Sequence, residues 1–185
     1  MNAWVVFVAY QLVWFAAVIG AGHGLAWPGA VAAITFVVWQ LLRRAARGQA
    51  LLMVTLGIVL GLLVDGGAAM AGLLHYAAAD RALPAGGAPL WILGLWACFA
   101  LTFEQSLAFL CRRPWLALAF GAVGGPLAYW GAQRGWQAVQ FGTPLWAPLL
   151  WLAVGWALAT SMFAWTLRRL QPQLASNTGK RGETL

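Results

Sequence analysis

The sequence predicts an all-α, polytopic membrane protein: a bundle of six transmembrane helices with both termini in the cytoplasm. Three observations lead to this prediction. Of the 185 residues, 63% are hydrophobic and only 8% are charged, whereas a soluble domain carries about 25% charged residues. Six apolar runs are each long enough to cross a hydrocarbon core of about 30 Å. The basic residues fall almost entirely in alternate connections between these runs.

The apolar runs define one domain. They cover residues 4–21, 26–42, 50–73, 89–111, 115–133 and 144–167. The first run has no basic residue before it, unlike a secretory signal, and is interpreted as a retained helix. Residues 1–170 are therefore predicted to form a six-helix transmembrane domain, and residues 171–185 a disordered, polar cytoplasmic tail.

The positions of Lys and Arg predict the orientation of the bundle. Only Arg81 and Arg134 lie in the connections on the outer side. The other basic residues lie on the opposite side, at Arg43, Arg44, Arg47, Arg112, Arg113, Arg168, Arg169, Lys180 and Arg181. Because positive residues accumulate on the cytoplasmic side, both termini are predicted to be cytoplasmic. The net charge of +7 does not indicate nucleic-acid binding, since no basic stripe with polar readers is present.

Asp65 is the only charged residue in the third run. A carboxylate in hydrocarbon costs several kcal/mol unless it is protonated, paired or hydrated. Steps of four residues place Gly57, Gly61 and Asp65 on one stripe of small residues, which allows another helix to approach closely. Asp65 is therefore expected to point into the bundle.

Counting about 1.5 Å per residue places Tyr129 of the fifth run, and Arg134 just beyond the end of that run, near the depth of Asp65. If the third and fifth runs touch, Asp65 and Arg134 are expected to form an ion pair joined by the tyrosine hydroxyl. Gly61 and Gly125 are expected near this contact.

A second polar layer is predicted closer to the cytoplasm. Glu104 and Gln105 of the fourth run come out at the height of Gln11 and Thr35. Two nearby hydroxyls, Thr102 and Ser106, lie four residues apart and are expected to bond to helix carbonyls.

Two features leave a cavity open as an alternative to plain packing. Gly124, Gly125 and Pro126 predict a kink in the fifth run, which either packs closely or lines a cavity. Tryptophans inside the runs either fill gaps or line a site for a flat or long apolar ligand; they are Trp14, Trp96, Trp130, Trp151 and Trp156.

Motifs for metals and cofactors are missing from the sequence, and neither kind of ligand is expected. His23 and His75 lie in different segments. Cys98 and Cys111 are about 20 Å apart along a helix, beyond disulfide reach, and are interpreted as packing residues.

Taken in order, the motifs resemble a family of small bacterial inner-membrane proteins of unknown function. The matching residues are Gln11–Phe15, Trp27–Gly29, Gly61–Asp65, Leu95–Ala100, Ser106 and Gly124–Tyr129. The resemblance implies a multi-pass protein of the bacterial inner membrane. The sequence departs from the family pattern at Tyr10, where the family tends to have Asn, and at Glu104-Gln105, where it tends to have Asn-His. Similar proteins are often encoded near fatty-acyl-modifying enzymes, which implies a lipid-related role by association.

Three functions remain open from the sequence. The first is an accessory protein, binding protein or enzyme that handles an acyl or isoprenoid chain, with Asp65 as general base or head-group anchor. The second is a small proton-coupled carrier using Asp65 and Glu104. The third is a non-catalytic partner of another membrane protein. Membrane lipids are expected partners in each case, and nucleic acid is not.

Overall fold

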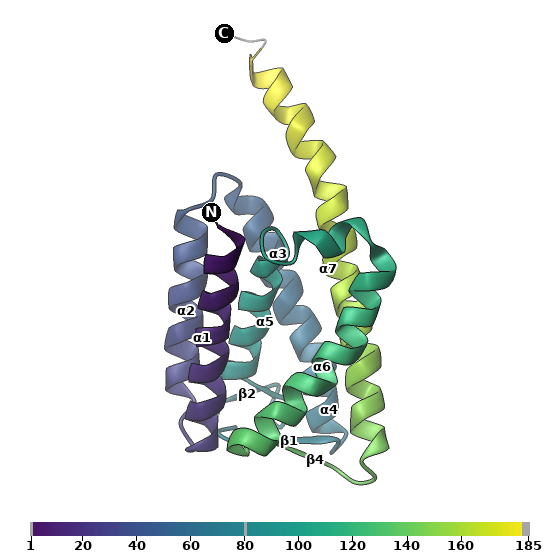
Figure 1. Cartoon of the computed structure of the whole chain (residues 1–185). Helices are drawn as coiled ribbons and strands as arrows, with labels where there is room; N and C mark the ends of the chain where they lie inside the picture. Colours follow the sequence, from purple (N-terminus) through teal and green to yellow (C-terminus); the bar gives the residue numbers. More distant parts are fainter. Residues whose placement is uncertain (1, 80, 183–185) are drawn as a thin grey trace.

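The computed structural model describes residues 2–79 and 81–182, with the backbone alone for 171–182. The α-helices of this part are α1 (Ala3–Gly22), α2 (Trp27–Leu42), α3 (Arg47–Gly61), α4 (Gly67–Met70), α5 (Leu90–Thr102), α6 (Pro114–Trp136) and α7 (Trp146–Gly182) (Figure 1). A π-helical turn, Leu62–Gly66, joins α3 to α4, and a 3-10 helix, Ala108–Arg112, precedes α6. The predicted disordered tail, residues 171–185, stays a prediction, because its side chains and residues 183–185 lie outside the described part.

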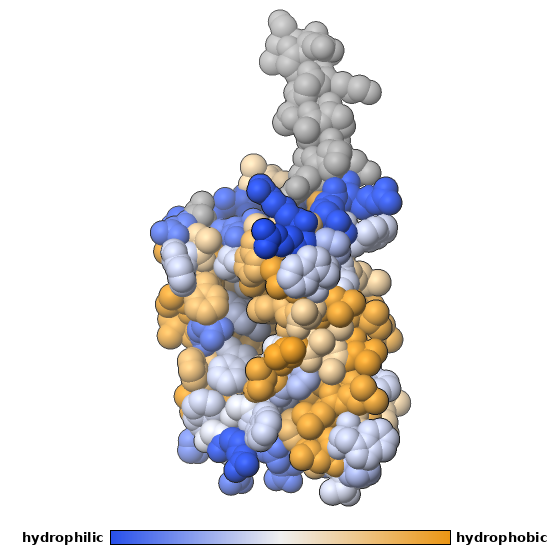
Figure 2. All heavy atoms as spheres, turned by 45° about the vertical axis from the view of Figure 1, so that its right-hand side comes forward, coloured by the Kyte–Doolittle hydropathy of each residue, from blue (hydrophilic) through white to orange (hydrophobic). Residues whose placement is uncertain are grey.

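The outer surface is compatible with a membrane. Three segments are long and apolar enough to cross one, namely Ala3–Gly22, Arg47–Met70 and Trp146–Leu170, while the apolar helices α2 and α5 are shorter. Large apolar side chains face outward along the bundle, among them Leu12, Ile34, Leu63 and Leu158. On the face shown in Figure 2, an apolar belt lies between two polar ends. The mainly helical, membrane-compatible fold predicted from the composition is confirmed to this extent.

The helices form two packed groups that lie side by side (Figure 1). In the first group, α2 packs on α1 and α5, and α3 packs on α5. In the second group, α6 and α7 form a helical hairpin. We call one end of the bundle the arginine end, since it carries the α2–α3 and α5–α6 connections with Arg43, Arg44, Arg47, Arg112 and Arg113.

Short strands at the opposite end, which we call the strand end, were not predicted. β1 (Leu74–Tyr76) pairs antiparallel with β4 (Val139–Phe141), and β2 (Ala82–Leu83) pairs with β3 (Ala88–Pro89). β1 follows α4 of the first group, whereas β4 follows α6 of the second. The β1–β4 pair therefore joins the two groups through backbone hydrogen bonds.

The third and fifth apolar runs touch through side chains, where Tyr129 of α6 reaches Asp65, but their main backbone packing is with other helices. Among the described residues, α3 packs on α5, and α6 packs on α7. A Cβ atom added to Gly57 would lie 2.7 Å from the Trp96 carbonyl oxygen, and one added to Gly61 would lie 2.6 Å from Trp96 Cδ1. Gly57 and Gly61 thus form the predicted close-packing face, but its partner is α5.

Gly125 lies against a tryptophan in the same way. A Cβ atom there would lie 2.6 Å from Trp156 Cδ1 on α7. The Trp96 and Trp156 rings stack, with centroids 4.3 Å apart and planes 24° apart. Gly61 and Gly125 are therefore linked through two stacked tryptophans instead of a direct helix contact.

The fourth apolar run forms a shorter helix than predicted. α5 ends at Thr102, and the chain turns before the 3-10 helix that contains Cys111. Thr102 Oγ1 donates to the Phe99 carbonyl at 2.6 Å, and Ser106 Oγ donates to the Thr102 carbonyl at 3.3 Å, as expected for these hydroxyls. Such bonds compete with helix continuation. Cys98 and Cys111 are both buried and free, in agreement with a packing role.

The Gly124-Gly125-Pro126 motif serves both of the roles that the sequence left open. α6 runs through Pro126, and the kink itself stays a prediction. Gly125 packs on Trp156, whereas a Cβ atom on Gly124 would meet no atom within 4 Å. Adjacent glycines of one helix therefore have opposite surroundings.

This difference predicts opposite effects of two alanine substitutions. Gly125→Ala should destabilise the protein by about 1–3 kcal/mol, because the added methyl group overpacks the tryptophan. Gly124→Ala should be neutral or stabilise it by up to about 1 kcal/mol through helix propensity. The thermal unfolding midpoints in detergent measure both effects, and equal midpoints would contradict the packing of Gly125.

Candidate functional site

Asp65 lies in the π-helical turn and is fully buried. A π-helical turn holds more residues than an α-helical one, so it re-aims the side chains within it. The Val64 carbonyl beside Asp65 accepts a hydrogen bond of 2.8 Å from Trp151 Nε1 of α7. The irregular backbone is thus supported by the second helix group. Such turns are frequent at functional sites.

Three uncharged donors converge on the Asp65 carboxylate. Tyr76 donates to Oδ1 at 2.5 Å, and Tyr129 donates to the same oxygen. Trp96 Nε1 donates to Oδ2 at 2.5 Å. The donors come from β1, α6 and α5, so the carboxylate joins both helix groups. In the part of the chain that the structure describes, no cation contacts Asp65.

Tyr76 is the donor that sequence analysis missed. It lies opposite Val139 in the β1–β4 pair, and the Trp91 ring packs edge-on against it with centroids 6.0 Å apart. Trp91 Nε1 also donates to the Ala77 carbonyl at 3.2 Å, which holds this segment over the site. Burial, and then the charge of Asp65, raises the pKa of Tyr76 well above the usual tyrosine value. The hydroxyl therefore keeps the proton that it donates.

Arg134 does not pair with Asp65, contrary to prediction. Its side chain is exposed, and its guanidinium carbon lies 6.0 Å from the centroid of the Trp130 ring. Arg134 and Tyr129 are five residues apart on α6, which corresponds to about 140° around the helix axis. Since Tyr129 points inward, Arg134 points outward. The depth estimate was correct for Tyr129 but ignored the direction of the Arg134 side chain.

A cavity of about 50 Å³ adjoins the two tyrosines. Its walls come from α1, α5, α6, α7 and the strands, and are mainly aromatic. The aromatic wall consists of Tyr10, Trp14, Tyr76, Trp91, Trp96, Tyr129 and Trp156. A water molecule needs about 10–15 Å³ on this scale, so the cavity holds a few water-sized groups. Trp14, Trp96 and Trp156 thus belong to an aromatic cavity, which was one of the two alternatives.

A wider groove of about 350 Å³ continues from this cavity between α1 and α6. Its wall includes Tyr10, Trp14, Ala128 and Trp156, which the cavity shares, and Gly124. Figure 1 shows α6 crossing the bundle obliquely and diverging from α1 toward the arginine end.

The rim of the groove is exposed and apolar, with Phe120 38% and Leu127 57% accessible. Gln11 also lines the groove and is half-buried. The groove therefore connects the apolar outer surface with the aromatic cavity.

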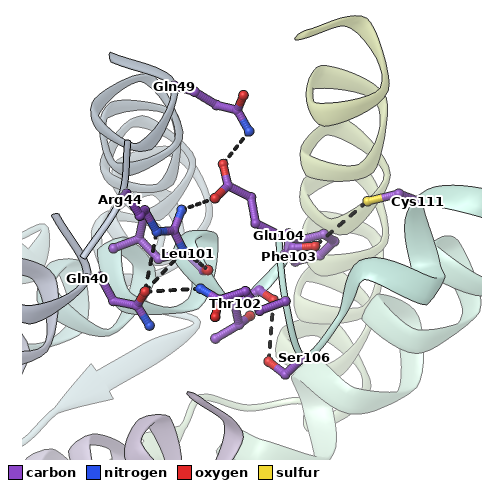
Figure 3. A network of polar contacts seen from close by, with 10 residues as sticks. Gln40, Arg44, Gln49, Leu101, Thr102, Phe103, Glu104, Ser106 and Cys111 are labelled. Carbon is purple, nitrogen blue, oxygen red and sulfur yellow. Dashed lines mark hydrogen bonds and ion pairs between the residues drawn. The ribbon is translucent and has the colours of Figure 1, made fainter. Parts of the chain in front are cut away.

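Glu104 belongs to a separate network at the arginine end (Figure 3). Its carboxylate forms an ion pair with Arg44 and accepts a hydrogen bond from Gln49. Arg44 also donates to the Leu101 carbonyl at 2.8 Å. Burial lowers the pKa of Arg44 and Glu104 opposes this shift, and an arginine remains charged in any case. The network fastens the α2–α3 connection to the end of α5.

Gln105 joins this network through Gln40, to whose Oε1 atom it donates at 3.1 Å. The predicted inner layer therefore contains Glu104 and Gln105, but its other members differ from the prediction. Thr35 is exposed and Gln11 lines the groove. The depth estimate treated residues 89–111 as one straight helix, and the early end of α5 moves Glu104 toward the α2–α3 connection.

One protein-family model matches a stretch of the chain that includes the residues around Asp65 and those around Glu104. A family model described as a protein of unknown function, DUF2878, matches residues 3–162. The chain belongs to this family. No curated protein and no solved structure matches the chain. Membership of DUF2878 agrees with the predicted resemblance to a family of unknown function, and the match includes Asp65, its three donors and the groove. Within the described residues of this DUF2878 chain, no group of three or more His, Cys, Asp or Glu side chains is placed to bind a metal.

The contacts of Asp65 predict which substitutions are energetically coupled. In a double-mutant cycle, Asp65→Asn and Tyr129→Phe should couple by at least about 1 kcal/mol, because both remove the same buried hydrogen bond. Asp65→Asn and Arg134→Gln should be additive within about 0.5 kcal/mol. Unfolding in mixed micelles measures the free energies. Coupling to Arg134 instead of Tyr129 would contradict the arrangement described above.

Proposed function

We propose that this DUF2878 protein is a multi-pass protein of the bacterial inner membrane that binds one lipid chain, acyl or isoprenoid, in the groove between α1 and α6. The observation that carries the proposal is the form of the groove. It opens on the apolar outer surface at Phe120 and Leu127 and leads to a cavity beside a buried carboxylate. A lipid chain with a polar end fits this arrangement, with its apolar tail in the groove and its polar end in the cavity.

The membrane topology that we propose has six spans with both termini in the cytoplasm. The spans are α1, α2, the continuous segment Arg47–Met70, α5, α6 and the apolar part of α7. α5 has 13 residues, about 20 Å, and is shorter than a hydrocarbon core of about 30 Å. The β2–β3 connection and the turn after Thr102 extend it at its two ends. The accumulation of arginines at one end supports the orientation.

The polar end of the ligand must supply most of the selectivity. A lipid chain that enters the groove moves from the apolar bilayer into an apolar site, so the hydrophobic effect contributes little to the binding free energy. Close packing against aromatic rings adds contact energy. Hydrogen bonds at Tyr76 and Tyr129 are available to only those lipids whose heads fit them. The groove therefore supports selective binding of one type of lipid, as opposed to the unselective contact that any membrane protein makes with lipids.

The other functions considered have less support. A proton-coupled carrier needs a path between its acidic groups, but Asp65 and Glu104 share no hydrogen-bond partner. A membrane-embedded enzyme using Asp65 as general base needs access to the carboxylate, whereas three hydrogen bonds from the protein occupy most of its acceptor sites. A purely structural partner of another membrane protein has no need for the cavity.

The proposed topology predicts the signals of reporter fusions. Reporters joined after Gly48 and after Arg113 should be active in the cytoplasm, and reporters joined within residues 82–87 should be active outside it. Paired alkaline phosphatase and fluorescent-protein fusions measure the two sides. Reversed signals would contradict the orientation, and cytoplasmic signals at all positions would contradict the six spans.

Filling the groove should remove the bound lipid. Gly124→Phe places a ring in the groove, where a Cβ atom has no neighbour within 4 Å. Lipid extraction and mass spectrometry of the purified variant should show at least about a fivefold loss of the co-purified lipid, because the ring occupies the volume of the chain. Gly131→Phe is the matched control, since Gly131 has equally open surroundings on α6 but does not line the groove. Equal lipid content in both variants and the wild type would overturn the proposal.

A further inference from the structure

The hydrogen bonds to Asp65 determine which polar atoms face the cavity. A tyrosine hydroxyl has one hydrogen and two acceptor lone pairs. Tyr76 and Tyr129 both use their hydrogens on Asp65, and both line the cavity. The lone pairs that remain on these two oxygens are acceptors. A ligand head that enters the cavity must therefore supply a donor.

One donor in the same cavity lacks a well-formed hydrogen bond. Trp156 Nε1 is buried and forms none of good geometry within the described part of the chain, although it lies near the Tyr129 hydroxyl. The Trp156 ring lines both the cavity and the groove, and its stacking on Trp96 fixes its orientation. A buried N–H group without an acceptor costs about 1–3 kcal/mol in protein interiors. The ligand head therefore also meets a donor that needs an acceptor.

We propose that the cavity selects a lipid whose head is an uncharged hydroxyl group, that is, a long-chain or isoprenoid alcohol. This inference rests on the proposed function and specifies the class of its ligand. A hydroxyl donates one hydrogen bond and accepts two. It donates to one of the two tyrosine oxygens and accepts from Trp156 Nε1, so a single head group pairs with one acceptor and with the donor of the cavity wall.

Charged heads fit this arrangement less well. A carboxylate or phosphate has only acceptors at neutral pH, and it would face the lone pairs of the tyrosine oxygens, which are acceptors as well. An ammonium group satisfies the tyrosine oxygens and is attracted to the aromatic rings, but it leaves the Trp156 N–H without an acceptor. The volume of about 50 Å³ also favours a head of one or two heavy atoms.

A competition experiment with matched heads tests this inference. The full chain in phosphatidylcholine nanodiscs is labelled with a hexadecanol probe that carries a photoreactive diazirine near the end of its tail. Crosslinks are mapped by mass spectrometry to the groove segment 120–128. Unlabelled hexadecanol should compete at a concentration at least about tenfold lower than hexadecanoate or hexadecylamine, since only the hydroxyl forms both hydrogen bonds.

Three variants connect the preference to the cavity. Trp156→Phe should weaken competition by hexadecanol about fivefold, as expected for one buried hydrogen bond of about 1 kcal/mol. Tyr76→Phe should do the same, and it serves as the second test if Trp156→Phe does not fold. Trp165→Phe is the control, because Trp165 is exposed on α7 and stacks on Arg169 instead of facing the cavity.

The possible failures are distinguishable. Labelling of the groove with equal competition by all three heads would refute the hydroxyl selection and leave the lipid-binding proposal intact. Stronger competition by hexadecylamine would also refute it and would identify Asp65 as a counter-ion. Labelling that is no stronger than in Gly124→Phe would refute both proposals, and water would then be the group that satisfies Trp156.

Discussion

The buried carboxylate of Asp65 is the constraint on which the rest of the bundle depends. A buried carboxyl group must receive hydrogen bonds from the protein, or the fold loses stability. The donors that meet this requirement are Tyr76, Tyr129 and Trp96, and each belongs to a different element. The π-helical turn aims the carboxylate, and the β1–β4 pair brings Tyr76 over it. Local irregularities at the strand end thus bring the hydrogen-bond donors to one buried carboxyl group.

Two stacked tryptophans, Trp96 and Trp156, lie between the two helix groups. Glycines usually allow two helix backbones to approach, but here each glycine accommodates a tryptophan. Trp96 occupies the space at Gly61, and Trp156 occupies the space at Gly125. The stacked rings hold α5 and α7 together while α6 diverges from α1.

The sequence predicted those properties that depend on one helix at a time. The burial of Asp65, the small-residue face of Gly57 and Gly61, and the depth of Tyr129 all follow from position along a helix. The Arg134 pairing failed because depth was considered without rotation about the α6 axis. Tyr76 was beyond prediction, because its position depends on a strand pair between residues far apart in the chain.

The inner layer was predicted only in part for a related reason. Glu104 was assigned to a long straight helix, whereas Thr102 ends that helix with side-chain hydrogen bonds to the backbone. The charge of Glu104 then meets Arg44 in the neighbouring connection. Which connection lies nearest depends on where a helix ends, and helix ends are set by local competition for backbone hydrogen bonds.

The two carboxylates of the described bundle therefore have different physical roles. Glu104 forms an ion pair with Arg44, and the two side chains are 20% and 9% accessible, respectively. This ion pair stabilises one end of the bundle. Asp65 has hydrogen-bond donors but no cation, and its two tyrosine donors line a cavity. The ion pair of Glu104 and Arg44 leaves no polar group for a ligand. At Asp65, by contrast, the tyrosines that donate to the carboxylate also line the cavity wall. The polar chemistry available to a membrane ligand is consequently concentrated beside Asp65.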